Sequence, residues 1–483
     1  ASRAKPLPCF LRVSVVLQAM AVEEAGDSLV AKGGEAIVSF TTKLPQRFHV
    51  QEDPLVVPSS LTRYGLSEVV NRLLGLEKPA PFDFLINGEF LRTDLHGYID
   101  AKKLSSEKEL KLEYVLALIE PEQTQVDELP DWISSLAALG PIPSDWFAAS
   151  SYDGSLRLYQ AGSARLTARL CDASVTAIAA VPNGPDGGSS YLAAASKDGI
   201  VRCSRLQLGA KPSVGPAASL HSSLHTGALQ TVSLNEDASL LAGGGWDHSI
   251  LIWNAGPSVF ELAEETERTS GSLKRKAAAM TDMEEPKFIL KGHSQVISCT
   301  HFGAQERYPF TLLSGSWDSS VRVWDVVAAS CVCNWTVARA VTSFSMSPGS
   351  PPQMATSHED GHVSLWDIRA PPHPTVQHAL SLDSSTGLPL ASAQAPHRRM
   401  ASQVAWCPLD TQRLASVGHD GNVCILDPRS PQMPLQRVRL GKPGPVPTKM
   451  LCLTWLSREE LAVGGSDGKV VRLLLGQSEP GGD

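Results

Sequence analysis

The sequence predicts a mainly β protein with two parts, a small head that mixes strands with a helix and a larger ring of short antiparallel sheets. Three observations support this prediction. Residues 290–326 alternate apolar and polar positions in short runs separated by turn residues. An aspartate followed six positions later by an aromatic or large apolar residue recurs along residues 153–473. Residues 36–119 lack this repeat and contain a helical pattern instead.

Residues 290–326 define the repeating unit of the larger part. The stretch begins with Lys291-Gly292-His293 and ends with Val323-Trp324-Asp325. Gly-His at the front and Trp-Asp at the back are the sequence signature of one blade of a WD-repeat β-propeller. The stretch therefore predicts a four-stranded blade, and its recurrence predicts a ring of such blades.

A buried hydrogen-bond chain is predicted inside this unit. Asp318 falls in the turn between two predicted strands, where a carboxylate accepts backbone N–H groups. We expect His293, Trp324 and one strand hydroxyl, either Ser314 or Ser316, to complete the chain. Serine, histidine and aspartate together also suggest a hydrolase, but no Gly-x-Ser-x-Gly turn accompanies them in this stretch. We therefore interpret the group as structural.

The spacing from turn aspartate to aromatic residue predicts seven blades. Three copies end on the tryptophans Trp253, Trp324 and Trp366, and one degenerate copy ends on Ser204. The seven turn aspartates are Asp153, Asp198, Asp247, Asp318, Asp360, Asp420 and Asp467.

A histidine upstream of the turn is available in three of these blades. His225, His293 and His397 precede their aspartates by 22, 25 and 23 residues. Only these three blades are therefore predicted to hold the full network, with each histidine acting as a core residue.

The last blade lacks a fourth strand of its own, because only a tail at residues 477–483 follows its third predicted strand. A ring left open would expose unpaired strand edges. We expect a strand from residues 120–129 to complete the last blade, so that the propeller spans residues 120–476.

Two long spacings predict insertions near residues 255–286 and 370–396, which we expect to be exposed loops that are at least partly disordered. The first insertion contains Lys274, Arg275 and Lys276. This basic cluster is either a nuclear import signal or an ordinary solvated charge run.

Residues 36–119 predict a ubiquitin-like β-grasp head. Leu66, Val69, Val70 and Leu73 follow the spacing of one buried helix face, and Ser67 is the expected cap. The expected elements are strands at 36–42 and 47–51, a helix at 65–76, a hairpin at 82–92 with a type I′ turn at Asn87-Gly88, and a strand at 109–116.

Composition excludes several classes of function. The formal net charge of −8 argues against a general polyanion binder, so RNA contact requires a local patch. Nine cysteines without a Cys-x-x-Cys pair predict reduced thiols and no zinc site. We find no catalytic constellation, predict no cofactor and no metal of its own, and see no apolar run of the ~18 residues that span a membrane.

The N-terminal residues 1–35 precede the first predicted strand. Residues 1–19 are basic and contain a short apolar stretch, which is compatible with a weak targeting segment. We favour a disordered or non-native extension.

Motifs in both parts resemble one family, the WD-repeat-protein-12 group of ribosome-biogenesis factors, which carry a ubiquitin-like (NLE-type) head. The resemblance covers nearly the whole chain after residue 35, and the head motifs are its specific part. The matching runs are 62–68, 81–93, 104–107, 131–135 and 151–154.

The resemblance implies a non-enzymatic factor for assembly of the large ribosomal subunit. Its propeller is expected to dock onto the propeller of the block-of-proliferation protein, which holds pescadillo, and the complex joins pre-ribosomal particles during rRNA processing. The AAA ATPase midasin then grips the head and removes the factor. The expected location is nucleus, nucleolus and nucleoplasm.

The resemblance also assigns a role to Glu107. In the family, the acid at this motif position completes the coordination of a metal ion held by the MIDAS domain of midasin. A carboxylate suits such an ion, because Mg²⁺ prefers hard oxygen ligands. The alternative is an ordinary surface glutamate.

A short motif in the fifth predicted blade suggests a second function. Residues 366–369, Trp-Asp-Ile-Arg, match the short WD-x-R pattern of substrate receptors of cullin-ring ubiquitin ligases. Arginine often follows the Trp-Asp of a blade, and the ubiquitin-like head fits that class poorly.

Overall fold

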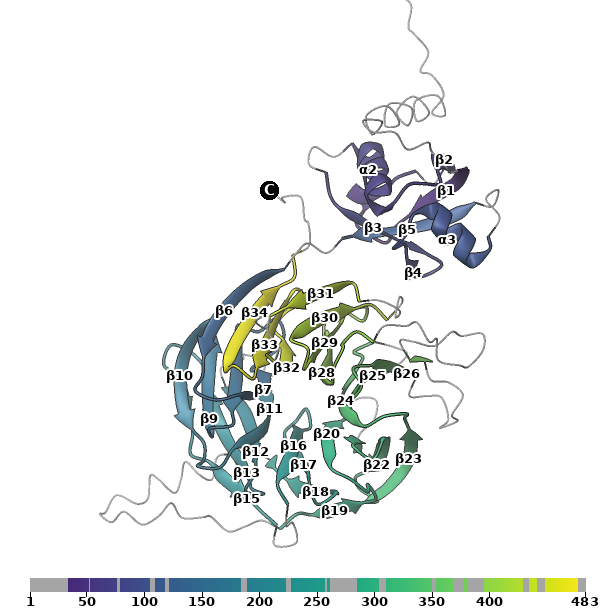
Figure 1. Ribbon diagram of the computed structural model, residues 1–483. Helices are drawn as coiled ribbons and strands as arrows, with labels where there is room; N and C mark the ends of the chain where they lie inside the picture. Colours follow the sequence, from purple (N-terminus) through teal and green to yellow (C-terminus); the bar gives the residue numbers. More distant parts are fainter. Residues whose placement is uncertain are drawn as a thin grey trace, which may run out of the picture. The chain divides into compact units, whose positions relative to one another are not determined.

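The computed structural model divides the chain into two compact units. Their described residues are 34–51, 53–75, 79–104 and 109–117 in the head, and 121–183, 189–222, 227–256, 259–260, 285–303, 310–349, 353–367, 378–379, 395–428, 434–440 and 448–476 in the second unit. The two units are shown in Figure 1 and are described separately below.

The head is a five-stranded mixed sheet with two helices, as predicted in outline. The sheet order is β2-β1-β5-β3-β4, with β1 and β5 parallel and the other neighbours antiparallel. The elements are β1 (Glu35–Thr41), a 3-10 turn η1 (Gln46–Phe48), β2 (Leu55–Pro58), α2 (Arg63–Leu74), β3 (Phe82–Ile86), β4 (Glu89–Phe90), α3 (Leu95–Lys102) and β5 (Leu110–Leu116).

Helix α2 and the β3–β4 hairpin form as their sequence patterns predict. Leu66, Val69 and Val70 of α2 are buried in the head core. Asn87 and Gly88 both adopt positive φ, 52° and 85°, which is the requirement of a type I′ turn. Both predictions are confirmed.

The predicted strand at residues 47–51 is wrong. Phe48 is buried there against Phe82 at a ring distance of 6.1 Å. The Val50 N–H donates to the hydroxyl of Tyr114 at 3.1 Å, and that hydroxyl donates to the Phe48 carbonyl. A tyrosine side chain therefore satisfies backbone groups that a strand would pair, and the second strand forms later, as β2.

The capping prediction for Ser67 is also wrong, because α2 begins four residues earlier with Thr62 as its N-cap. The Ser67 hydroxyl instead accepts the Phe82 N–H at 3.0 Å, joining the helix to β3. Helix α3 was not predicted. Its N-cap is Asp94, whose carboxylate accepts the Gly97 N–H at 3.1 Å.

The second unit is a seven-bladed propeller of antiparallel sheets, counted over its described residues, as predicted. From the inner strand outward, blade 1 contains β7 (Ile133–Ala138), β8 (Trp146–Ser151), β9 (Ser155–Gln160) and β10 (Ser163–Arg169); blade 2 contains β11 (Val175–Asn183), β12 (Ser189–Ser196), β13 (Val201–Gln207) and the short β14 (Ser213–Val214) and β15 (Ala218–Leu220); blade 3 contains β16 (Leu229–Leu234), β17 (Leu240–Gly245), β18 (Ser249–Asn254) and β19 (Phe288–Lys291).

The other four blades repeat this plan. Blade 4 contains β20 (Ile297–Phe302), β21 (Thr311–Ser316), β22 (Ser320–Asp325) and β23 (Ser330–Thr336); blade 5 contains β24 (Val341–Met346), β25 (Gln353–His358), β26 (Val363–Asp367) and β27 (His378–Ala379); blade 6 contains β28 (Ala401–Trp406), β29 (Leu414–Gly418), β30 (Asn422–Leu426) and β31 (Gln436–Arg439); blade 7 contains β32 (Met450–Trp455), β33 (Glu460–Gly465), β34 (Lys469–Leu474) and β6 (Glu122–Glu128). The inner strands of successive blades contact one another around the ring, and β32 contacts β7 (Figure 1).

Blade 7 is completed by β6, which confirms the predicted closing strand. β6 pairs with β34 from Leu474↔Glu122 to Lys469↔Glu128. Asp127 of β6 also accepts hydrogen bonds from Arg157 at 2.6 Å and from the Tyr159 hydroxyl at 3.2 Å. The earliest strand of the propeller is thus fastened to both the last blade and the first.

Neighbouring blades pack so closely that the second strands carry small residues. At Gly315, a Cβ atom would lie 2.7 Å from the Cys299 sulfur and 2.8 Å from a methyl of Val341 in blade 5. Glycine is therefore required where blades 4 and 5 meet. Across the described residues, no helix is both long and apolar enough to cross a membrane.

Candidate functional site

All seven predicted turn aspartates perform the same local task. Each carboxylate accepts the backbone N–H of the residue two positions later, which closes the turn between the second and third strands. The donors and N···O distances are Ser155 to Asp153 (2.8 Å), Ile200 to Asp198 (3.0 Å), Ser249 to Asp247 (3.1 Å), Ser320 to Asp318 (3.0 Å), His362 to Asp360 (3.1 Å), Asn422 to Asp420 (3.2 Å) and Lys469 to Asp467 (3.2 Å).

The residue after each turn aspartate adopts positive φ, which explains the frequent Asp-Gly pair. Five of these residues are glycines, and His248 (φ 67°) and Ser319 (φ 60°) are the exceptions. At Gly154 a Cβ atom would lie 2.2 Å from the carbonyl of Cys171, so glycine is required there by both conformation and space.

Blade 4 contains the four-member chain. The His293 Nδ1–H donates to Asp318 at 2.8 Å, because a carboxylate can only accept. His293 Nε2 lies 2.7 Å from the Ser314 hydroxyl, which accepts the indole N–H of Trp324 at 2.8 Å. Ser314 and not Ser316 is therefore the strand hydroxyl in the chain.

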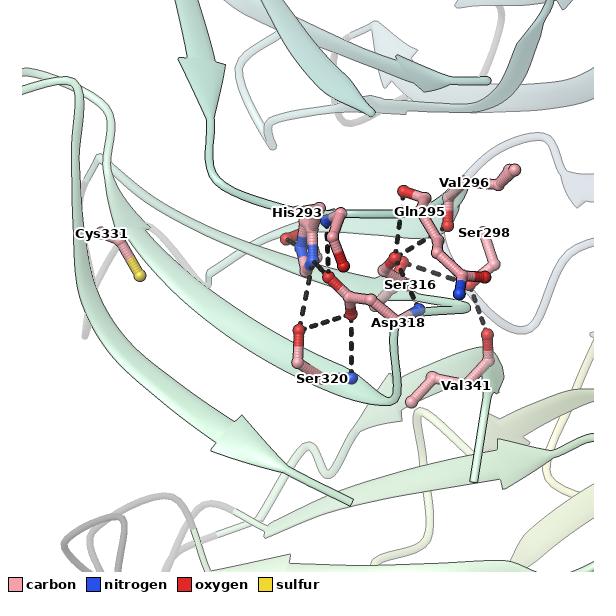
Figure 2. Close-up of polar contacts among 12 residues, drawn as sticks. His293, Gln295, Val296, Ser298, Ser316, Asp318, Ser320, Cys331 and Val341 are labelled. Carbon is pink, nitrogen blue, oxygen red and sulfur yellow. Dashed lines mark hydrogen bonds and ion pairs between the residues drawn. The ribbon is translucent and has the colours of Figure 1, made fainter. Parts of the chain in front are cut away.

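Ser316 has a separate role beside the chain. Its hydroxyl lies within hydrogen-bond distance of the Gln295 and Val296 carbonyls, at 3.2 and 2.9 Å (Figure 2). Figure 2 also shows Ser320 bonded to Asp318 at 2.6 Å. The loop that enters blade 4 is therefore held by the second strand and by the turn together.

Blade 6 repeats three of the four members. His397 contacts Asp420 through Nδ1 at 3.0 Å and the Ser416 hydroxyl through Nε2 at 2.8 Å. Leu426 stands where blade 4 has tryptophan, so this chain has no indole donor. The sequence did not identify Ser416, although the ten-residue spacing from Ser314 to Trp324 also separates Ser416 from Leu426.

The electrostatics of both turns favour ionised carboxylates. Burial opposes ionisation of Asp318, but hydrogen bonds from His293 and Ser320 outweigh it and hold the pKa of Asp318 well below its usual range. The pKa of Asp420 is likewise held low, with burial again opposed by His397. Burial disfavours the charged form of His397, yet the bond to Asp420 and the neighbouring Cys424 raise its pKa to about 9.

Blade 5 uses a different histidine. The Trp366 indole donates to the Thr356 hydroxyl at 2.8 Å, and this hydroxyl lies 3.0 Å from His358 Nε2. His358 belongs to the second strand and was not predicted. Asp360 faces Arg339 and His362, and despite the opposing effect of burial the bonds from His362 lower its pKa to about 2.

Blades 2 and 3 depart from the chain in other ways. Asp198 forms an ion pair with Arg202 at 2.7 Å. In blade 3 the residue ten positions before the buried Trp253 is Gly243, where a Cβ atom would lie 3.1 Å from the indole ring. The indole ring of Trp253 therefore lies against the backbone of Gly243, where blade 4 has the side chain of Ser314.

Several predicted residues lie outside the described part of the chain: His225, Glu107, and the cluster Lys274, Arg275 and Lys276. Among the described residues, no group of three or more histidine, cysteine, aspartate or glutamate side chains is placed to hold a metal ion.

The His–Asp–Ser groups are closed to substrates. The side chains of His293 and His397 are 0% exposed, and those of Asp318 and Asp420 are 7% exposed. Such groups fasten loops to sheets.

Comparisons with known proteins assign the family. The NLE (NUC135) domain model matches residues 36–99, and the WD domain, G-beta repeat model matches residues 218–254 and 284–325. A ribosome biogenesis protein WDR12 homolog from Chlamydomonas reinhardtii is 31% identical over 457 residues, which cover 91% of this chain and 97% of the relative. The chain belongs to the WDR12/Ytm1 family of ribosome biogenesis proteins.

More distant members of the family agree. The WDR12 homolog of Oryza sativa subsp. japonica is 29% identical and covers 90% of this chain and 95% of its own length. Ribosome biogenesis protein ytm1 of Emericella nidulans is 30% identical, covering 78% of each chain.

The family models map onto parts of the structure already described. The NLE match spans β1 to α3 of the head, and the WD matches fall on blades 3 and 4 with their preceding segments. The other blades of this family member are evident from their strand pairing. A WDR12/Ytm1 protein of this kind is a non-catalytic WD-repeat scaffold.

Proposed function

We propose that this chain is an assembly factor of the large ribosomal subunit that works as a subunit of the PeBoW complex, with pescadillo and the block-of-proliferation protein. The propeller docks onto the propeller of the latter, and the complex is required for processing of rRNA precursors. The head is the handle by which midasin removes the factor from the pre-ribosomal particle. The expected location is nucleolus and nucleoplasm.

The observation that supports this proposal is the joint presence of an NLE head and a propeller, aligned over 97% of a relative named as a ribosome biogenesis protein. A propeller without catalytic groups provides surfaces for partners. A separate head provides a second contact that can be used without disturbing the first.

Affinity purification of the tagged full chain tests the complex. Pescadillo, the block-of-proliferation protein and large-subunit rRNA precursors are expected to co-purify, and depletion of the chain is expected to make those precursors accumulate. Recovery of cullin-ring adaptors without pre-ribosomal components would instead favour the ubiquitin-ligase receptor. Trp366 of its WD-x-R pattern is bonded inside blade 5, and the arginine lies outside the described residues.

We assign Glu107 as the metal clasp of the head. A carboxylate donated in trans suits a Mg²⁺ ion that keeps several water ligands and takes one or two acids. Glu107→Ala is expected to abolish binding of the full chain to the MIDAS domain while leaving the PeBoW partners bound. Glu109, exposed two residues later, provides the matched control Glu109→Ala.

The clasp is measured by pull-down with the MIDAS domain, with Mg²⁺ and with chelator. Equal binding by wild type and Glu107→Ala, or binding that ignores chelator, would falsify it. A Glu107→Ala variant that keeps its PeBoW partners but loses MIDAS binding would show that the clasp acts independently of complex formation.

Lys274, Arg275 and Lys276 are proposed as an import signal. A fluorescent fusion in which all three are alanine is expected to leave the nucleolus and accumulate in the cytoplasm. If the fusion stays nucleolar, the cluster is not the required signal.

A further inference from the structure

One backbone contact recurs in every blade and defines a face of the ring. The residue before each turn aspartate donates its N–H to the carbonyl of a residue at the entrance of the inner strand. The seven pairs, donor first, are Tyr152–Trp132 (3.1 Å), Lys197–Ser174 (2.9 Å), Trp246–Ala228 (3.0 Å), Trp317–Val296 (3.0 Å), Glu359–Ala340 (3.3 Å), His419–Met400 (2.9 Å) and Ser466–Lys449 (2.8 Å). We call the surface formed by these fourteen residues the turn face.

Large aromatic side chains gather on part of the turn face. Trp132, Trp246 and Trp317 are 43%, 50% and 39% exposed. Trp246 of blade 3 meets Trp317 of blade 4 edge to face, with ring centres 5.6 Å apart. Trp132 meets Tyr152 in the same way at 6.4 Å within blade 1. Exposed aromatic pairs of this kind are typical of binding surfaces, not of free surface.

Two lysines flank the aromatic pair of blade 1. The Lys197 ammonium of blade 2 lies 5.2 Å from the ring centre of Tyr152, and the Lys449 ammonium of blade 7 lies 5.5 Å from that of Trp132. Among the described residues, neither lysine has a carboxylate within ion-pair distance, so both charges are available to a partner.

The two features follow one another along the ring. Blades 7, 1, 2, 3 and 4 are neighbours through their inner strands, so the lysine-flanked pair and the tryptophan pair belong to one arc. At the residue before the turn aspartate, blades 5 and 6 outside the arc carry Glu359 and His419, and blade 7 carries Ser466. The aromatic surface is thus confined to that arc and is not a general feature of the fold.

A nucleic acid does not suit this arc, although aromatic rings and lysines are each used to bind one. In blades 1 to 4, the aromatic residue or lysine on the turn face directly precedes a turn aspartate. Burial opposes ionisation of Asp153, Asp198 and Asp318, but hydrogen bonds outweigh it and lower their pKa values. A phosphate backbone carries a charge at every nucleotide and would pass all of these carboxylates, on a chain of formal net charge −8, whereas a protein segment can place a few acidic groups at the two lysines alone.

We propose that the turn face over blades 7, 1, 2, 3 and 4 binds an acidic protein segment that carries at least one large apolar side chain. Acidic groups of the segment pair with Lys197 and Lys449, and the apolar side chain packs against Trp246 and Trp317. Aromatic anchors supply most of the affinity of such an interface, and the charges select the partner. The inference does not depend on which protein carries the segment.

Selection of peptides on the full chain tests this proposal. A phage library of random 16-residue peptides is panned on wild type, with depletion on the K197A/W246A/W317A/K449A variant. The enriched peptides are expected to be acidic and to contain tryptophan, phenylalanine or leucine. Binding of the synthetic peptides, measured by fluorescence anisotropy, is expected to weaken at least about tenfold in W246A/W317A and to become weaker with salt.

Two further variants separate binding from folding. K197E/K449E keeps all the aromatic rings and is expected to lose acidic peptides, with an unchanged circular dichroism spectrum. F310A/L409A removes exposed apolar residues from loops between first and second strands, at the opposite end of the blades, and is expected to bind like wild type.

Three results overturn the proposal. One is a selection that enriches no peptide over the depleting variant. Another is an enriched pool that is not acidic, or whose binding survives both W246A/W317A and K197E/K449E. The last is binding of a 20-nucleotide uridine RNA that is lost in the same variants, which would assign the arc to nucleic acid.

Discussion

Blades 4 and 6 use the same histidine, serine and aspartate geometry but differ in one member. In blade 4 the Trp324 indole donates to Ser314, whereas in blade 6 the equivalent residue is Leu426, which has no donor. The difference changes how the serine can behave. Ser314 accepts the indole N–H in addition to its contact with His293, while Ser416 has no indole to accept from.

One position on the third strand therefore decides whether the strand hydroxyl accepts an indole N–H. In blade 6 both ring nitrogens of His397 can donate, one to Asp420 and one to Ser416, which is the arrangement of a charged imidazole. The raised pKa of His397, about 9, agrees with that arrangement. The stability of blade 6 is therefore expected to depend on pH through His397.

Removing the histidine from either blade is expected to have the largest effect. His293→Ala and His397→Ala each leave a buried aspartate and serine without their partner and should lower the free energy of unfolding by about 4 kcal/mol. All ten tryptophans lie at or after residue 132, so tryptophan fluorescence in denaturant reports the propeller alone.

Lys291 provides the control, since it is exposed at the end of β19, two residues before His293. Lys291→Ala should stay within about 0.5 kcal/mol of wild type. A loss below about 1 kcal/mol in both histidine variants would show that the blades are held by packing and not by these chains.

The pH dependence of stability tests the charged form of His397 in blade 6. The folded pKa of His397, about 9, is above the unfolded value of about 6.5. Its contribution is therefore fully present below pH 6.5 and is lost as the pH rises through 9, a change of about 3 kcal/mol. The difference in unfolding free energy between wild type and His397→Gln, measured from pH 6 to 10, should fall by that amount. A constant difference would contradict the charged form of His397.

Many features of the blades could be predicted from the sequence, because the spacings between residues reflect local backbone geometry. A turn aspartate must accept the N–H two residues later, so all seven turns were found by one spacing. The closing strand followed from the missing partner of β34. Both rules depend on backbone pairing, which repeats from blade to blade.

Other features depended on tertiary contacts that no spacing encodes. Ser314 and Ser316 share a strand face, and only the position of the incoming loop assigns one to His293 and the other to backbone carbonyls. His358 joins the blade 5 chain from within its own strand. In the head, Tyr114 takes the backbone bonds of the segment expected to be a strand. The aromatic arc emerges only when separate blades are placed side by side.

Converting blade 4 toward blade 6 is expected to cost less than losing a histidine. Trp324→Leu removes the indole but leaves Ser314 bonded to His293, so the loss is mainly one of packing. Trp324 is 2% exposed, and a partly filled cavity of this kind should cost about 2 kcal/mol. The matched change Trp246→Leu, at a tryptophan that is 50% exposed, should cost under about 1 kcal/mol. Equal losses of unfolding free energy at the two sites would contradict a special contribution of the buried Trp324 to blade 4.

The smallest effect on the free energy of unfolding is expected at the residue two positions after the turn aspartate, where the two blades also differ. Ser320 donates its hydroxyl to Asp318 at 2.6 Å, and Asn422 donates its amide to Asp420 at 2.8 Å. Ser320→Ala and Asn422→Ala keep the backbone bond of the turn and the histidine contact, so each should cost about 1 kcal/mol, the net value of one hydrogen bond. If Ser320→Ala instead matched His293→Ala in denaturant unfolding, the serine rather than the histidine would be what orients the carboxylate of blade 4.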